Sequence, residues 1–286
     1  MTYSTSNGCK RRLPEDLTQI PDAVFEQLMS GDTIFGDDFD LAEIERWYND
    51  EKNASFACYE GVDTTQYHSL NWQHGFRFLA GKHFDNCLAI GVADGTDIEP
   101  LAPQVVRFQC IEPEQKWWRP DISGKPSIYH SPSIDGSLRT FGDGFFDLAI
   151  ALSCLHHIPN VSNVINEMGR TVAKGGLILL REPITMMGDW RFSRSGMTRR
   201  ERGLPPKPFL RAVEKAGFEI KSVTYFDCPL VARGVALLGI KPFNNRAVVM
   251  LDKLLCLALK WNMHYRPLNI FQKIAPSTVF VVAQKK

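Results

Sequence analysis

The stretch FDLAIALSCLHHIPNVSNVINEMGRTVAKGGLILLREP, from Phe146 to Pro183, contains two short apolar runs separated by a helical pattern. The runs, 148–152 and 177–180, are bounded by polar residues or glycine, as expected of strands buried on both faces of a sheet. We expect a helix between them, capped by Asn160 and ended by Lys174-Gly175-Gly176. Its apolar stripe consists of Val161, Val164, Ile165, Met168 and Val172. Strand, helix and strand form a parallel crossover unit, so ligands should bind beyond the carboxyl ends of these strands.

The chain from residue 86 onward repeats this alternation of strands and helices. Thr96 could cap a helix after the first of these strands, and another helix covers 206–216. The other strands are expected at 86–91, 105–111, 127–129, 219–225 and 278–283. This pattern predicts an α/β fold with a doubly wound, mostly parallel, seven-stranded Rossmann-like sheet.

Two segments do not belong to that alternation. Residues 1–80 carry helical spacing over 14–30, 39–48 and 65–79, and we interpret them as an N-terminal helical cap. Residues 229–276 separate the last two strands and form an inserted helical subdomain. The remaining parts, 81–228 and 277–286, make up the main domain.

The composition is that of an ordinary globular protein. The chain has 286 residues, 44% of them hydrophobic and 23% charged, with a net charge of +1, so no nucleic-acid partner is expected. Seven scattered cysteines form no CxxC pair, which indicates reduced thiols and no metal site. The sequence has no apolar leader and no run near the ~20 apolar residues of a membrane span, so we expect a cytoplasmic protein.

A glycine turn follows the first expected strand. Gly91 and Gly95 frame it, as is needed where a ligand approaches the backbone closely, although a plain packing turn would also use glycine. Glu112 lies 17 residues after Gly95 (112 minus 95), at the end of the next strand, where a carboxylate can accept both hydroxyls of a ribose. This pairing fits both dinucleotide and S-adenosyl cofactors. A short-chain reductase is disfavoured because the Tyr-x-x-x-Lys pair, Tyr48 and Lys52, precedes the glycine turn.

Several further motifs occur in a fixed order over residues 64–227. They are AIGVADG (89–95), CIEP (110–113), IDGSLRTFGDGFFD (134–147), LHHI (155–158), VAKGGLILLREP (172–183) and KAGFE (215–219). Together they resemble the class I S-adenosylmethionine-dependent methyltransferases, in particular those with a type 11-like methyltransferase domain. The resemblance implies an enzyme whose cofactor is S-adenosyl-L-methionine.

The resemblance also implies roles for the cofactor-side residues. Gly91 and Gly95 would line the methionine and ribose parts, and Glu112 would hold the ribose. Asp135, which lies 12 residues before Asp147, would accept a hydrogen bond from the adenine amino group. Two further residues would lie beside the sulfonium: Ser153 and Leu155.

Two positions depart from the family pattern. Ala89 stands where an acidic residue is usual, and Ala93 stands where a third glycine is usual. The methionine amino group would then need another partner, for which Tyr67, His68 and Asn71 are candidates. A non-catalytic cofactor-binding or scaffold protein with a degenerate glycine motif therefore remains the alternative.

Polar pairs follow the two strands of the opening stretch. His157 is our candidate for a catalytic base, with Glu182 as a second catalytic candidate. His156 and Arg181 would be acceptor-side walls. The alternatives are a packed histidine and an internal Arg181–Glu182 ion pair.

The cationic segment 184–206 is expected to form a lid over the acceptor. Its contact candidates are Asp189, Trp190, Arg191 and Arg199, because arginine binds phosphate or carboxylate well. The alternative is a solvated helix face. The pattern looks similar to methyltransferases that modify sugars or glycan precursors, which favours O-methylation of a small molecule, sugar or glycan precursor by in-line transfer.

The apolar helical pattern of the insertion covers 247–261 and is flanked by Arg246, Lys253 and Lys260. It could rest on a membrane surface. A helix packed on the core or on a second subunit is the other interpretation, and the sequence does not give the oligomeric state.

Overall fold

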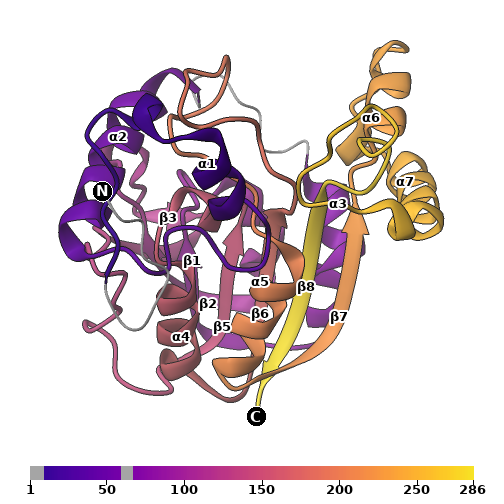
Figure 1. Ribbon diagram of the computed structural model, residues 1–286. Coiled ribbons are helices and arrows are strands. Elements are labelled where there is room, and N and C mark those ends of the chain that lie inside the picture. Colours follow the sequence, from indigo (N-terminus) through magenta and orange to yellow (C-terminus); the bar gives the residue numbers. More distant parts are fainter. Residues whose placement is uncertain (1–9, 59–66) are drawn as a thin grey trace.

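A mixed sheet of eight strands forms the centre of the molecule (Figure 1). The computed structural model describes residues 10–58 and 67–286. The strand order is β3-β4-β2-β1-β5-β6-β8-β7, with only β3 and β8 antiparallel to their neighbours, which confirms the doubly wound, mostly parallel fold. The strands are β1 Phe84–Ile90, β2 Val105–Ile111, β3 Asp121–Ile122, β4 Lys125–His130, β5 Phe146–Leu152, β6 Val172–Pro183, β7 Phe218–Phe226 and β8 Thr278–Lys285.

The sheet has one strand more than the seven expected. β3 is only two residues long and pairs antiparallel with β4. Ser123 and Gly124 connect them in the left-handed region, at φ 51° and 77°, as a tight hairpin turn requires. Two residues are too few to produce a strand pattern in the sequence.

The opening stretch forms β5, a short 3₁₀ turn η6 (Leu155–His157), the helix α4 (Val161–Thr171) and β6. β5 and β6 pair in parallel, from Leu148↔Leu177 to Leu152↔Arg181. The helix ends three residues before the expected Lys174, because β6 begins directly at Val172. Asn160 does not cap the helix with its side chain, which instead donates a hydrogen bond to the carbonyl of Asp135.

Helices cover both faces of the sheet (Figure 1). α4 and α5 (Pro206–Lys215) pack on one face, and α3 (His68–His74), η3 (Phe76–Leu79) and η4 (Thr96–Gln104) pack on the other. The segment η4 is a 3₁₀ helix in which Pro100 and Pro103 lack the backbone donors of a regular helix. Thr96 does not cap it, because its hydroxyl donates to Asp94.

The described N-terminal segment forms a hydrophobic cluster of its own. It contains η1 (Leu17–Gln19), α1 (Asp22–Leu28) and α2 (Leu41–Cys58). Trp190 is completely buried in this cluster, where its ring stacks on Phe35 at 4.7 Å and its Nε1 donates to the sulfur of Met29. The expectation that Trp190 contacts the acceptor is therefore wrong. Its apolar surface instead joins the N-terminal helices to the segment after β6.

Residues 184–205, which we call the lid segment, connect β6 to α5 and are fastened by buried arginines. Arg200 donates to Glu43 and Asp50 of α2. Arg202 donates to the carbonyls of His156, Ile158 and Phe35. Both guanidinium groups are buried, so the lid segment is not a solvated helix face. It ties the N-terminal helices to the turn after β5.

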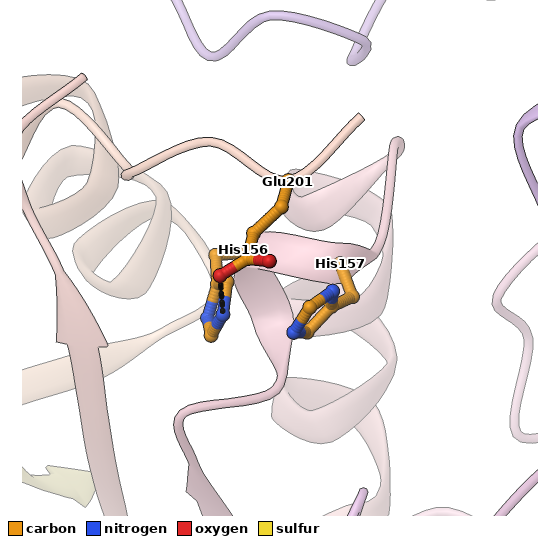
Figure 2. A group of neighbouring side chains, drawn as sticks. All are labelled: His156, His157 and Glu201. Atoms are coloured by element: carbon orange, nitrogen blue, oxygen red, sulfur yellow. Dashed lines mark ion pairs between the residues drawn. The ribbon is translucent and has the colours of Figure 1, made fainter. Parts of the chain in front are cut away.

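A buried ion cluster lies beneath the lid segment. Glu201 reaches from it toward the adjacent rings of His156 and His157 (Figure 2). One ring nitrogen of each histidine and one carboxylate oxygen of Glu201 lie within 4.8 Å of one another. His156 Nδ1 is 2.8 Å from Glu182 Oε2, and its Nε2 is 3.6 Å from Glu201 Oε1. Burial opposes the charged form of His156, but the hydrogen bonds to Glu182 and Glu201 raise its pKa to about 9. Despite burial, the hydrogen bond from His156 lowers the pKa of Glu201 to about 2.

The insertion between β7 and β8 lies at the carboxyl end of β7, at the upper right of the view, and α7 packs against β7 and α3 (Figure 1). It contains α6 (Pro229–Ala236), η7 (Pro242–Asn244), α7 (Arg246–Leu259) and η8 (Lys260–Asn262). Asp252 of α7 accepts hydrogen bonds from the backbone of Asp227 and Cys228. This contact anchors α7 at the end of β7.

We expect Arg202→Met to lower the free energy of unfolding by roughly 3 kcal/mol, because several buried carbonyls lose their donor. Urea unfolding followed by circular dichroism measures the change. Arg199→Met is the matched control: Arg199 is exposed, so its loss should change stability by less than about 0.5 kcal/mol. Equal effects of the two substitutions would contradict the fastening role of Arg202.

The ion cluster predicts a pH dependence of stability. The pKa of His156 rises from 6.5 to about 9 on folding, so its stabilising effect is complete below pH 6.5 and is lost as the pH rises through 9. The free energy of unfolding should fall by about 3 kcal/mol over that interval. His156→Gln should remove most of this fall, whereas His83→Gln, at an exposed position, should leave it intact.

Candidate active site

A cavity of about 390 Å³ opens at the carboxyl ends of β1, β2, β4 and β5. Its walls come from the four turns after these strands and from α2. The lining residues include Tyr48, Asn49, Glu51, Gly91, Ala93, Glu112, Pro113, Glu114, Trp117, His130, Gly136, Ser137, Leu138, Phe141, Ser153, Cys154, His157 and Ile158. The cavity therefore lies at the edge of the sheet where the sequence predicted ligand binding.

The glycine turn brings the backbone close to its neighbours at two positions. Gly91 has φ 61°, and a Cβ there would lie 2.4 Å from Cβ of Cys154. Gly95 has φ 83°, and a Cβ there would lie 2.5 Å from Ile122. Gly91 lines the cavity, whereas Gly95 makes room for the packing of β3. Both positions exclude a side chain, for different reasons.

Ala93 keeps the conformation that a glycine would supply. Its φ of 48° lies in the left-handed region, which costs an alanine roughly 1 kcal/mol. Its N–H donates to Glu112 Oε2 at 2.9 Å, and its carbonyl accepts from the Tyr129 hydroxyl at 3.0 Å. These two bonds hold the turn in place without the third glycine of the family pattern.

Glu112 lies in the cavity wall at the end of β2. Its carboxylate accepts hydrogen bonds from the N–H groups of Ala93 and Glu114, at 2.9 and 3.1 Å. Burial raises the pKa of Glu112, while these two hydrogen bonds oppose that rise. A carboxylate has about four lone-pair sites, so two backbone donors leave acceptor capacity for ligand hydroxyls.

The other cofactor-side candidates are dispersed. Ser153 lines the cavity, with φ 58° and its hydroxyl accepting from Arg181 Nε at 3.1 Å. Leu155 is fully buried in the main core. The carboxylate of Asp135 bonds the backbone of Ser137 and the side chain of Arg139 and borders a separate shallow hollow. Only its neighbours in sequence reach the cavity, so the structure does not support a direct adenine contact for Asp135.

Three predicted acceptor-side residues lie outside the cavity lining. The Glu182 carboxylate accepts from the N–H groups of Cys154 and Leu155 and pairs with His156. Arg181 pairs with Asp97 at 2.9 Å and stacks on an aromatic ring. Arg181 and Glu182 therefore pair with other residues and not with each other, and neither lines the cavity. His156 belongs to the buried ion cluster and does not line the cavity either.

The residues proposed to replace the acid missing at Ala89 also have internal partners. The amide of Asn71 bonds Asp97 and Arg181. His68 Nε2 lies 2.7 Å from the carbonyl of Thr96, and the ring of Tyr67 is the one that stacks with Arg181. Asn71 and Tyr67 contact Arg181, which donates to Ser153, and none of the three candidates lines the cavity.

The polar side chains predicted on the lid segment contact protein or solvent. Arg191 bonds Asp189 and Asp22 and stacks on Phe25, so it holds α1. Arg199 is exposed and lies outside the cavity lining. Asp189 and Arg191 are therefore engaged within the protein, while an acceptor role for Arg199 stays a prediction.

His157 lies in the cavity wall beside residues that the sequence did not single out. Its Nδ1 is 2.8 Å from Glu51 Oε2, and the other Glu51 oxygen accepts from the N–H of Arg200. Tyr48 and Asn49 line the same end, and burial raises the pKa of Tyr48. Asn49 and Glu51 were missed because α2 runs ten residues past the expected end at 48, whereas Tyr48 was considered only as part of a Tyr-x-x-x-Lys pair. The usable signal was the i,i+3 spacing of Tyr48 and Glu51, which puts both on one helix face.

Comparison with known proteins places this geometry in a family. The model of the family described as a methyltransferase domain matches residues 65–223, which is more than half of the chain. The sequence matches no curated protein. Many solved structures share the fold, all of the three below with a TM-score of 0.50.

A candidate methyltransferase from Bacillus halodurans is 17% identical, over 73% of this chain and 96% of its own. An S-adenosylmethionine-dependent methyltransferase from Mesorhizobium loti is 15% identical, over 75% and 97%. A phosphoethanolamine N-methyltransferase from Haemonchus contortus is 16% identical, over 76% and 52%. At these identities the likeness concerns the fold. The family match over residues 65–223 shows that this chain belongs to the methyltransferase domain family, and it is an S-adenosylmethionine-dependent methyltransferase.

Proposed function

We propose that the enzyme methylates an oxygen of a small molecule, sugar or glycan precursor, with His157 as the general base. The observation that carries this proposal is the pair of His157 and Glu51 in the wall of the cavity, 2.8 Å apart. An imidazole oriented by a carboxylate is a common proton acceptor in enzymes. A hydroxyl acceptor needs such a group, because it must lose its proton as the methyl bond forms.

The cavity has features that suit S-adenosylmethionine. Gly91 leaves an open approach to the backbone, and Glu112 would accept the ribose hydroxyls. Ser153 and His157 both lie in the cavity wall. When bound, the cofactor supplies an electrophilic methyl group on a sulfonium, which a nucleophile displaces in line. The protein's task is then mainly to position the acceptor.

The hydrogen bond to Glu51 selects the tautomer of His157. A neutral imidazole that donates from Nδ1 to a carboxylate keeps Nε2 as its basic nitrogen. That nitrogen would take the proton of the acceptor hydroxyl, and Glu51 would stabilise the resulting imidazolium. The backbone N–H of Arg200 donates a hydrogen bond to Glu51 and holds its carboxylate in place.

Support for a polyhydroxylated acceptor comes from α2. Arg191 and Trp190, which favoured a glycan in the sequence, are structural, so they give no support. Tyr48 and Asn49 line the cavity beside Glu51 and provide a phenol and an amide for hydroxyl groups. Ile158 adds an apolar surface at that end.

The alternative, a non-catalytic cofactor-binding or scaffold protein, rests on Ala89 and Ala93. Ala93 retains the left-handed conformation and its bond to Glu112, so the turn is intact at that position. This favours a functional cofactor site over a degenerate one.

Glu112→Ala should weaken S-adenosylhomocysteine binding at least tenfold, because hydrogen bonds to a charged group contribute roughly 1.5–3 kcal/mol. Isothermal titration calorimetry measures the change. Glu219→Ala, in an exposed position on β7, serves as the control and should bind normally. Unaltered affinity in Glu112→Ala would contradict the ribose role.

His157→Asn should lower kcat by roughly a hundredfold, because general-base catalysis accelerates a reaction by about 10²–10⁴-fold. The affinity for S-adenosylhomocysteine should stay unchanged. The assay follows the labelled methyl group from S-adenosylmethionine to a panel of sugar nucleotides and phenols. Glu51→Gln should lower kcat less and alter its pH profile.

His83→Asn, at an exposed position, is the matched control and should keep full activity. Full activity of His157→Asn toward an oxygen acceptor would exclude His157 as the base. Transfer to amines alone would contradict O-methylation.

A further inference from the structure

The outer face of α7 is apolar, which is unusual for a helix on a protein surface. Its inner face packs through Val248, Val249 and Cys256. The outward positions carry large apolar side chains, including Leu254 at 59% exposure and Leu257 at 71%. A surface helix normally presents polar residues to water. The outer face of α7 therefore differs from that of an ordinary solvent-exposed helix.

The same property extends over the whole insertion. Of nineteen exposed large apolar side chains among the described residues, twelve lie in residues 229–276, which make up only 48 of 286 residues. Exposed apolar groups gathered in this way mark interaction surfaces. The twelve are Leu230, Leu237, Leu238, Met250, Leu251, Leu254, Leu255, Leu257, Trp261, Leu268, Ile270 and Phe271.

The insertion is also strongly cationic. It contains seven lysines or arginines and one acidic residue, so its net charge is +6, although the whole chain has +1. The single acid, Asp252, is buried and bonded to backbone N–H groups. The basic residues are Arg233, Lys241, Arg246, Lys253, Lys260, Arg266 and Lys273.

We propose that the insertion is a docking surface for an anionic lipid bilayer. Exposed leucines interspersed with lysine and arginine match both the acyl chains and the negative headgroups of such a surface. Trp261 follows α7 with 81% of its surface exposed, and tryptophan favours the membrane interface. In the described parts of the chain no helix has the length and hydropathy to cross a bilayer, so the contact is peripheral.

Charge favours the bilayer over a second copy of the chain. Symmetric pairing of two insertions would bring two cationic surfaces together: the only acid of each insertion is buried, and of its seven basic residues Arg266 is paired with Glu26. Like charges at an interface are unfavourable. An anionic bilayer instead lowers the energy of every exposed cation, by about 1 kcal/mol each near the surface.

The topology orients the active site relative to this surface. β6 and β7 are both antiparallel to β8, so they are parallel to each other, and the insertion follows the carboxyl end of β7. The cavity opens at the carboxyl ends of the other parallel strands. If the proposed methyl transfer holds, the docked enzyme would present this edge toward amphipathic or lipid-linked acceptors.

Vesicle co-sedimentation of the full-length chain tests the docking. We expect binding to vesicles of phosphatidylcholine with about one third phosphatidylglycerol, weaker binding at high salt, and little binding to pure phosphatidylcholine. The double variant Leu254→Glu/Leu257→Glu should lower the partition coefficient roughly tenfold or more. Leu41→Glu is the matched control, since Leu41 is 61% exposed on α2 and should leave binding unchanged.

Lys253→Glu/Lys260→Glu provides a second variant that keeps the leucines, and it should reduce binding to anionic vesicles by a similar factor. The affinity of each variant for S-adenosylhomocysteine is measured as a control. An unchanged affinity shows that the fold is intact and separates loss of docking from loss of the methyltransferase site. Absence of vesicle binding by the unmodified chain would overturn the proposal. So would equal binding to neutral vesicles, or a dimer in analytical ultracentrifugation that Leu254→Glu/Leu257→Glu dissociates.

Discussion

The buried carboxylate of Glu182 holds the turn after β5, and the shape of the cavity depends on that turn. Backbone N–H groups of Cys154, Leu155 and His156 donate to it, together with Nδ1 of His156. A carboxylate without exposed surface is costly unless such donors surround it. The turn cannot relax without leaving this charge unpaired. Glu182 thus fixes His157 at the cavity wall without touching the cavity itself.

The sheet and the cofactor side were accessible from the sequence because they depend on local patterns. Alternating strands and helices follow from apolar spacing, and a glycine turn followed by an acid at the next strand end brings Gly91 and Glu112 to one cavity. The left-handed conformation of Ala93 could not be predicted from the sequence, since alanine does not favour that conformation. Only the bonds to Glu112 and Tyr129 explain it.

The acceptor side was predicted less well because its decisive contacts join distant parts of the chain. Arg200 pairs with Asp50, 150 residues away, and Trp190 packs on Phe35. The sequence of a cationic segment does not distinguish arginines that bind substrate phosphates from arginines that pair with carboxylates of an N-terminal helix. Glu51 lay beyond the expected end of its helix, so its pairing with His157 could not be foreseen.

The position of β8 in the sheet has a consequence for how the chain folds. β8 lies between β6 and β7, yet it follows the entire insertion in sequence. During synthesis β6 therefore keeps an open edge, and β7 has no partner, until all residues up to 285 are available. These long-range pairings make folding slow, and an unpaired edge strand favours aggregation. The exposed leucines of the insertion emerge before the sheet closes, so this apolar surface and the open strand edges are exposed at the same time.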